Sequence, residues 1–244
     1  MLAVTAALPN SPGDRPPVVL IHGAANSAGV WTFWQRALAE AGWASYAIDL
    51  RGHGRSDSTG LSRARMRDYA DDASSLVEQL SLRPVVMGWS MGGLVAMMVT
   101  GRAVVALAPS MPARAIDLAA PLREGEFGPE EYGITGADPD DQPAMPDLDR
   151  EERQLALASL GRESRLARDE RAAGVVVESM PCPLLIVTGA ADTQWPRSRY
   201  EGLWLPADHL EVAGASHWGL VLSLRALAVA APRVLDWLDR SGVG

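Results

Sequence analysis

A serine stands between two glycines in the pentapeptide Gly88-Trp89-Ser90-Met91-Gly92, directly after a short apolar run. The apolar run predicts a buried strand, so that the serine falls on a sharp turn from strand to helix. Small residues two positions before and after the serine let neighbouring backbone pass closely, and the turn exposes the hydroxyl. The pattern predicts that Ser90 attacks a carbonyl carbon while the backbone N–H of Met91 donates to the oxyanion.

A serine hydroxyl needs a base to accept its proton, and an imidazole with a pKa of about 6.5 suits this task near neutral pH. Of the four histidines, His22 and His53 precede the serine in glycine-flanked loops, and His209 falls in an expected strand. His217 follows the last expected strand, in a loop of small residues. We therefore predict His217 as the base, against the ordinary alternative of a structural histidine.

An acid must hold the other ring nitrogen of the base and stabilise the imidazolium. Asp192 comes just after an apolar run, at the carboxyl end of an expected strand, where open α/β sheets bind their ligands. Asp49 and Asp57 are of the right type but precede the serine, against the order serine, acid, histidine. Asp192 is the predicted acid, and Asp49 is expected to anchor a turn.

A second oxyanion donor should come from the loop after an early strand. The segment His22-Gly23-Ala24-Ala25 lies there, and we assign the donor to the backbone N–H of Ala24. His22 is expected to shape this loop through hydrogen bonds rather than to act as a base.

Short apolar runs that end in Gly, Asp or Pro indicate buried parallel strands. They occupy residues 18–21, 43–48, 84–87, 103–107 and 184–187. Helical periods lie between them at residues 29–41, 65–80 and 91–99. The alternation predicts an α/β fold with a mostly parallel central sheet flanked by helices. Residues 2–8 are a candidate antiparallel edge strand, and residues 209–212 a candidate late strand.

The alternation stops after Pro109, and strand signals are missing from residue 111 to residue 180. Residues 121–152 hold eleven acidic side chains against two arginines, and apolar residues return at helical spacing over 153–177. We expect residues 111–180 to form an inserted lid, or cap, of short helices over the carboxyl edge of the sheet. The alternative is a solvated loop that only bridges two strands.

These motifs, in this order, resemble those of the α/β-hydrolase fold superfamily, in its serine esterase and lipase-like branch. The motifs are His22-Gly23 with Trp31, Asp49 to Ser56, Gly88 to Gly93, Thr188 to Asp192, and Gly214 to His217. The resemblance implies an α/β-hydrolase core over residues 1–110 and 181–244. It also implies Ser90 as nucleophile, His217 as base and Asp192 as acid, with Ala24 and Met91 as oxyanion donors.

Two details narrow the branch of the superfamily and the kind of ester that the resemblance implies. A serine rather than an aspartate at position 90 disfavours the dehalogenase and epoxide-hydrolase branches. The loop His22-Gly23-Ala24-Ala25 departs from the HGGG type, which suggests simple acyl esters.

Composition limits the partners and the compartment. A net charge of −8 without a basic run argues against nucleic acid. No metal or cofactor is expected, because the histidines and carboxylates show no ligand spacing. Cys182 is expected to be a small buried residue. With no secretory signal and no apolar segment long enough to span a bilayer, we expect a cytoplasmic protein, and a homo-oligomer is left open.

Eight tryptophans against two phenylalanines suggest an apolar pocket. Trp89 and Trp218 adjoin Ser90 and His217, and Trp195 follows Asp192, so we expect these three to line it. Because an acidic lid would repel anions, the expected substrate is a neutral ester or lactone. The alternatives are acyl transfer, perhydrolysis, C–C lyase chemistry or biosynthetic cyclisation on the same residues, a small-molecule receptor, or an acidic docking surface.

Overall fold

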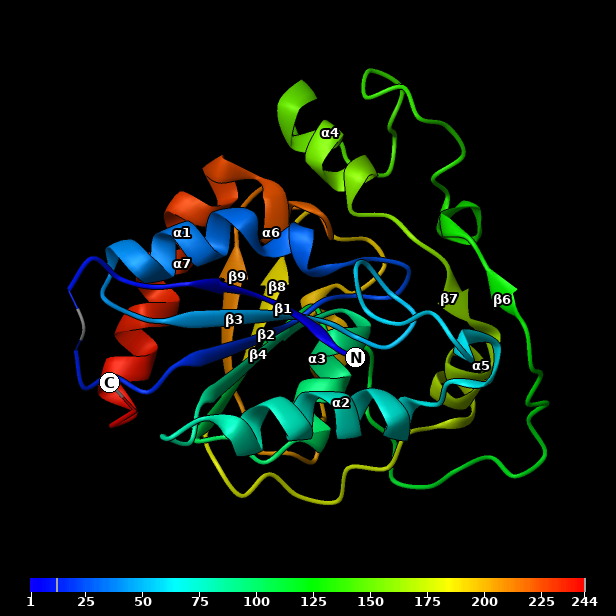
Figure 1. The fold of residues 1–244 in the computed structure, drawn as a ribbon, viewed down its shortest axis with the longest axis horizontal. Helices are drawn as coiled ribbons and strands as arrows, with labels where there is room; N and C mark the ends of the chain where they lie inside the picture. Colours follow the sequence, from blue (N-terminus) through cyan, green and yellow to red (C-terminus); the bar gives the residue numbers. More distant parts are fainter. Residues whose placement is uncertain (12, 244) are drawn as a thin grey trace.

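The computed structural model describes residues 1–11 and 13–243, and its centre is a seven-stranded sheet with strand order β1-β3-β2-β4-β5-β8-β9 (Figure 1). The strands are β1 (Ala3–Ala7), β2 (Val18–Ile21), β3 (Ser45–Asp49), β4 (Val85–Trp89), β5 (Ala103–Leu107), β8 (Leu184–Gly189) and β9 (Asp208–Val212). β1 pairs antiparallel with β3, and every other pairing in this sheet is parallel. The predicted mostly parallel sheet, its antiparallel edge strand and its late strand are confirmed.

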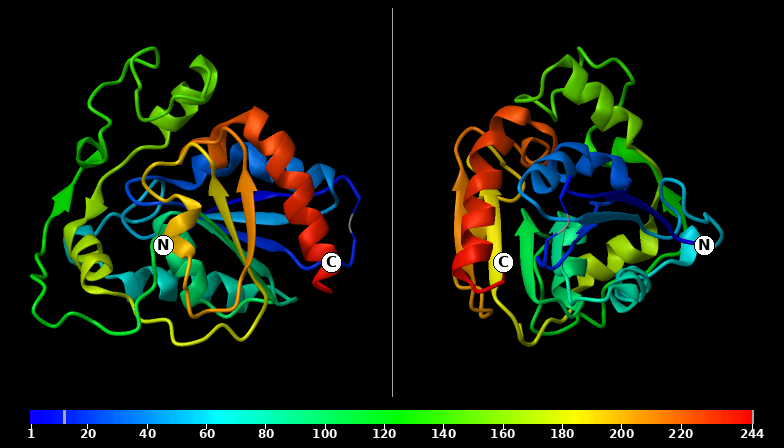
Figure 2. Two further views of the ribbon diagram at one scale, coloured as in Figure 1. Left: turned by 180° about the vertical axis from the view of Figure 1, so that it is seen from behind. Right: turned by 60° about the vertical axis from the view of Figure 1, so that its left-hand side comes forward.

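Helices cover both faces of the sheet because side chains along each strand alternate between the faces. In β2, Val18 and Leu20 belong to one apolar core, and Val19 and Ile21 belong to the other. The first core lies under α1 (Thr32–Glu40), α6 (Gly219–Leu222) and α7 (Leu224–Arg240). The 3-10 turn η1 (Ala28–Trp31) comes directly before α1. The second core lies under α2 (Met66–Gln79) and α3 (Met91–Met98) (Figure 2). No helix in the described ranges has both the length and the apolar character needed to cross a membrane.

The tryptophans Trp31, Trp34, Trp43 and Trp237 lie in the first apolar core. Trp31, Trp34 and Trp43 are fully buried, and Trp237 is almost so. The indole N–H of Trp34 donates to the carbonyl of Leu220 at 2.9 Å and fastens α1 to α6.

Residues 111–180, which we call the inserted segment, lie between β5 and β8. They contain β6 (Glu126–Phe127), η3 (Pro129–Tyr132), α4 (Arg150–Ala158), β7 (Glu163–Ser164) and α5 (Arg165–Ala173). α4 packs against η1 and α6, whereas α5 packs against α2 and the short turn η2 (Leu61–Arg63). The inserted segment thus runs along one end of the sheet, from α5 to α4 (Figures 1 and 2).

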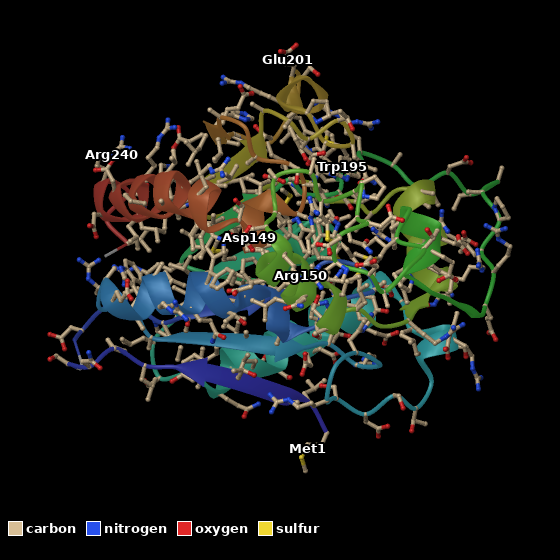
Figure 3. The ribbon with its side chains drawn as sticks, turned by 90° about the horizontal axis from the view of Figure 1, so that it is seen from above. Met1, Asp149, Arg150, Trp195, Glu201 and Arg240 are labelled. Carbon is tan, nitrogen blue, oxygen red and sulfur yellow. The ribbon has the colours of Figure 1, made fainter. Side chains whose placement is uncertain are left out.

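Two details of the inserted segment go beyond the sequence prediction. β6 and β7 form a small antiparallel ladder where only helices were expected, because strands of two residues are too short to show a period. α4 begins with a capping box, in which Asp149 accepts from the N–H of Glu152 and Glu152 accepts from that of Asp149. From above, this start of α4 lies over the middle of the molecule, and Trp195 lies to one side of it (Figure 3).

Candidate active site

Ser90 stands on the predicted turn between β4 and α3. Its φ of 55° and ψ of −118° are unusual for a residue with a side chain. A Cβ atom on Gly88 would lie 2.0 Å from the carbonyl oxygen of Gly92, and one on Gly92 would lie 2.2 Å from that of Ile21. Only glycine fits at either position, so this turn is built from backbone in direct contact with backbone.

His217 and Asp192 form a hydrogen-bonded pair beside that turn. Nδ1 of His217 lies 2.7 Å from Oδ2 of Asp192, while Oδ1 accepts the backbone N–H groups of Gln194 and Trp195, each at 2.9 Å. Burial raises the pKa of the Asp192 carboxyl, but His217 and the two N–H groups together lower it below its ordinary value. An ionised Asp192 holds the proton on Nδ1, which leaves Nε2 of His217 free to accept another.

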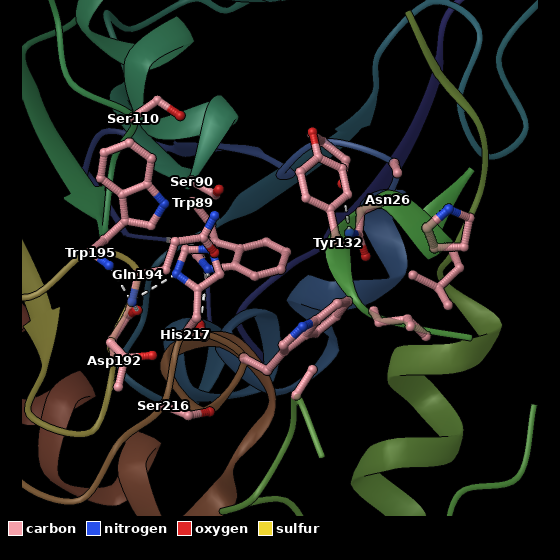
Figure 4. A pocket seen from close by; sticks show the side chains of 18 of the residues that line it. Asn26, Trp89, Ser90, Ser110, Tyr132, Asp192, Gln194, Trp195, Ser216 and His217 are labelled. Carbon is pink, nitrogen blue, oxygen red and sulfur yellow. Dashed lines mark hydrogen bonds and ion pairs between the residues drawn. The ribbon is translucent and has the colours of Figure 1, made fainter. Parts of the chain in front are cut away.

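Ser90, His217 and Asp192 all line one cavity of about 400 Å³ (Figure 4). Its walls come from the loops after the sheet strands and from the inserted segment, which contributes apolar side chains such as Ile134 and Leu160. The sequence therefore identified three residues that the structure brings together at the carboxyl edge of the sheet.

The three tryptophans assigned to the pocket line this cavity as well. Trp89 is almost fully buried, and its ring lies 5.0 Å from the His217 imidazole and 4.9 Å from the Trp218 ring. The indole N–H of Trp89 donates to the carbonyl oxygen of His217 at 3.1 Å. Trp89 therefore supports the loop that carries His217, in addition to forming a wall.

The loop after β2 lies against the serine. Ala24 lines the cavity, and a Cβ atom on Gly23 would lie 3.2 Å from Cβ of Ser90. His22 is fully buried, with Nδ1 donating to the carbonyl of Gly23 at 2.8 Å and Nε2 accepting the N–H of Leu50 at 3.2 Å. Burial and the neighbouring His53 lower the pKa of His22 to about 4. The bonds of a neutral His22 to both segments fit the loop-shaping role that we expected.

Asp49 anchors a turn, as expected. Its Oδ1 accepts the N–H of Ala28 at 2.7 Å, and its Oδ2 accepts the N–H of Arg55 at 3.1 Å. These bonds fasten the start of η1, which follows the loop after β2, and the turn at Arg55 to the end of β3.

Glu163, a fully buried carboxylate in β7 of the inserted segment, was not predicted from the sequence. It accepts the Tyr69 hydroxyl at 2.6 Å and the backbone N–H of Ala25 at 3.1 Å, and it lies 3.4 Å from Nε2 of His53. Burial raises the pKa of Glu163, but His53, Arg171 and Tyr69 together lower it to about 2. In the sequence, Glu163 stands among polar residues typical of a surface loop, so no local signal marks it.

Arg171, on α5, was also missed, although it lines the cavity. Nη2 donates to the hydroxyl of Tyr132 at 3.0 Å, and Nη1 lies 3.4 Å from Oγ of Ser110. An arginine in a charged amphipathic helix is normally solvated, so the sequence gave no reason to single it out.

The eleven acidic residues at 121–152 do not line the cavity. Several form ion pairs or caps instead: Glu131 pairs with Arg165 and Arg168, and Asp147 accepts the N–H of Ser216 at 2.8 Å. The inserted segment therefore lines the cavity with no acidic side chain that would repel an anion, and the charged side chain that it contributes there is Arg171.

Cys182 is partly buried against the second apolar core, and burial raises the pKa of its thiol. Within residues 1–11 and 13–243, no group of three or more His, Cys, Asp or Glu side chains is arranged to hold a metal ion.

A mostly parallel sheet, a serine on a strained turn and a histidine–aspartate pair beside it together define an α/β hydrolase. A model of the Alpha/beta hydrolase family matches residues 18–231, and the chain belongs to that family.

Similar proteins include esterases and lipases. The chain is 30% identical over 233 residues to the pimeloyl-[acyl-carrier protein] methyl ester esterase of Pectobacterium carotovorum, covering 93% of this chain and 84% of that protein. A monoacylglycerol lipase of Mycolicibacterium smegmatis is 36% identical over 84 residues, 32% of this chain and 30% of the lipase. A thermophilic esterase from Thermogutta terrifontis has the same fold, with a TM-score of 0.68 at 19% identity over 98% of this chain and 93% of the esterase.

Proposed function

We propose that this protein hydrolyses carboxylic esters through an acyl-enzyme formed on Ser90. The observation that supports this most strongly is the 2.7 Å pair of His217 and Asp192 beside a serine on a strained turn, all in one cavity. The esterases among the relatives point to the same class of reaction.

In the first step, Oγ of Ser90 attacks the ester carbonyl carbon while Nε2 of His217 takes the hydroxyl proton. The backbone N–H groups of Ala24 and Met91 hold the oxyanion, and Asp192 remains ionised beside the imidazolium. The C–O bond to the alcohol then breaks, and the alcohol leaves with the proton from His217. Water, deprotonated by His217, attacks the acyl-enzyme in the second step and releases the acid and Ser90.

The walls of the cavity support an ester or lactone with an apolar acyl or alcohol part. Trp89 and Trp218 lie next to the reacting residues. Ile134 and Leu160 line the same cavity from the inserted segment, which acts as a lid in this proposal. Burial of an alkyl chain against these side chains contributes about 0.8 kcal/mol per CH₂ group. Longer acyl chains should therefore bind better until the cavity is filled.

The test is a burst and turnover assay with p-nitrophenyl acetate, butyrate and octanoate. We expect turnover by the parent protein, loss of turnover in Ser90→Ala, and a mass increase at Ser90 after treatment with a serine-directed phosphonate. Ser75→Ala, at a half-buried position on α2 outside the cavity, is the matched control and should keep full activity. A folded parent protein that shows neither turnover nor adduct would contradict the proposal.

A further inference from the structure

Arg171 places a cation in the wall of the cavity, close to the nucleophile. Its two polar neighbours there are the hydroxyls of Tyr132 and Ser110. The backbone N–H of Ser110 donates to the carbonyl oxygen of Ser90 at 2.9 Å. Ser110, whose hydroxyl lies beside the guanidinium, is therefore joined to Ser90 by one backbone hydrogen bond.

The charge of Arg171 is not matched by a neighbouring carboxylate. The other two arginines of α5, Arg165 and Arg168, both pair with Glu131, but no carboxylate of the described residues lies within 4.0 Å of the Arg171 guanidinium. Glu163 lies farther away, and its oxygens already accept bonds from Tyr69 and from backbone N–H groups. Burial lowers the pKa of Arg171, but Tyr132 and Glu163 raise it more, so that the side chain is a cation.

The guanidinium also has hydrogen-bond donors to spare. It carries five N–H groups, and the described residues provide acceptors at Tyr132 and Ser110, whereas its buried Nε has no partner there. Both hydroxyls accept from Arg171, so each keeps its own hydrogen for a further acceptor. One guanidinium and two hydroxyls in a wall of the cavity are the donors that a carboxylate requires.

We propose that Arg171, Tyr132 and Ser110 bind a carboxylate that the ester substrate carries at a distance from its scissile bond. The substrate class is thus a half-ester of a dicarboxylic acid, or an ester with an acidic alcohol part, with an apolar spacer along Trp89 and Trp218. That the substrate is an ester rests on the proposed function. That the site binds a carboxylate does not, because this binding can be measured without turnover.

The first measurement compares matched esters on the parent protein. The probes are the mono-p-nitrophenyl esters of adipic and suberic acid and the same esters with the free carboxylate replaced by a carboxamide. These chain lengths avoid the rapid intramolecular attack by the free carboxylate that hydrolyses shorter half-esters. We expect kcat/KM to be about 10- to 100-fold higher for the acids at low salt, the factor typical of a charge-assisted hydrogen bond. Equal or better hydrolysis of the carboxamides would overturn the inference.

The second measurement asks which residue causes the preference. Arg171→Gln should lower kcat/KM for the acids by the same factor, mainly through KM, and should lower that for the carboxamides much less, because a neutral amide forms no ion pair with the guanidinium. Arg171→Lys should recover part of the loss, and Tyr132→Phe should show a smaller loss of the same kind. Arg150→Gln, which removes an exposed cation of the inserted segment outside the cavity, is the matched control and should leave the preference intact. Equal losses for acids and carboxamides in Arg171→Gln would show a structural role and overturn the inference.

A binding experiment separates this inference from the proposed function. Monoethyl adipate is titrated calorimetrically into Ser90→Ala and into the double variant Ser90→Ala with Arg171→Gln. If no ester is hydrolysed but binding depends on Arg171, the proposed function fails and the carboxylate site stands. If esters are hydrolysed but the half-ester binds both variants equally, the carboxylate site fails and the proposed function stands.

Discussion

The backbone N–H of Ala25, in the loop after β2, donates to Oε2 of Glu163, which lies 138 positions further along the chain in the inserted segment. The same carboxylate accepts the hydroxyl of Tyr69 from α2 and faces His53 from the loop after β3. Glu163 thus joins three parts of the core to the inserted segment. Because Ala24 precedes Ala25, the loop assigned to the oxyanion is held in place from outside the sheet.

We expect Glu163→Gln to lower both stability and turnover. The substitution keeps the size of the side chain but leaves the buried His53 without its carboxylate partner, which should lower the free energy of unfolding by about 3 kcal/mol. The less restrained loop should lower kcat for p-nitrophenyl butyrate about tenfold, with KM little changed, because oxyanion donors act through their position. Urea unfolding and steady-state kinetics measure the two effects.

Glu131→Gln is the control for this variant, since Glu131 is a partly exposed carboxylate of the same segment that pairs with Arg165 and Arg168. Its loss should cost less than about 1 kcal/mol and leave kcat unchanged. Equal stability and equal turnover in the two variants would show that Glu163 does not hold the loop.

The contrast between Ser90 and Glu163 shows what the sequence can predict. Ser90, Asp192 and His217 each follow an apolar run, and the carboxyl ends of parallel strands meet at one edge, so that local patterns suffice to bring them together. Glu163 and Arg171 lie in a segment without a strand period. Their positions depend on how β7 packs against η2 and how α5 packs against α2. Such tertiary packing leaves no mark in the local sequence, and counting the charges of the segment pointed to the opposite sign.

Asp192→Asn should abolish most activity without unfolding the protein. An asparagine can present its amide group to Nδ1 of His217 and favour the wrong tautomer, and it no longer stabilises the imidazolium. We expect kcat for p-nitrophenyl butyrate to fall about 10³- to 10⁴-fold, with a much smaller change in KM. Asp236→Asn, at an exposed carboxylate that pairs with Arg240, serves as the control and should retain full activity. A loss below tenfold in Asp192→Asn would remove this carboxylate from the mechanism.

The strained backbone at Ser90 predicts that glycine is more stabilising than alanine at this position, the reverse of their usual order in a helix. Both substitutions remove the hydroxyl, but glycine adopts a φ of 55° without the cost that alanine incurs there. Ser90→Gly should therefore be more stable than Ser90→Ala by about 1 kcal/mol in urea unfolding. At Ser75, within helix α2, the order should be opposite, with glycine less stable than alanine by about 1 kcal/mol. The same order at both sites would mean that the turn stores no strain.

His22 should make the fold sensitive to mild acid. Its pKa falls from 6.5 to about 4 because the side chain is buried and lies near His53, while Asp49 and Glu163 act in the opposite direction. Between these two pH values the unfolded chain binds a proton that folded His22 does not, so that stability rises with pH across this window and falls as the pH is lowered. The pKa of His53 is raised in the fold, so its own stabilising contribution is already complete below pH 6.5 and does not change in this window. Lowering the pH from 7 to 5 should therefore reduce the free energy of unfolding by about 2 kcal/mol through His22.

The variant His22→Gln tests this expectation. Glutamine can keep one donor for Gly23 and one acceptor for Leu50 without titrating, so that the free energy of unfolding of His22→Gln should fall by about 2 kcal/mol less than that of the parent protein between the two pH values. Urea unfolding at pH 7 and pH 5 measures this difference, and parallel losses in both proteins would show that His22 is not the group that titrates.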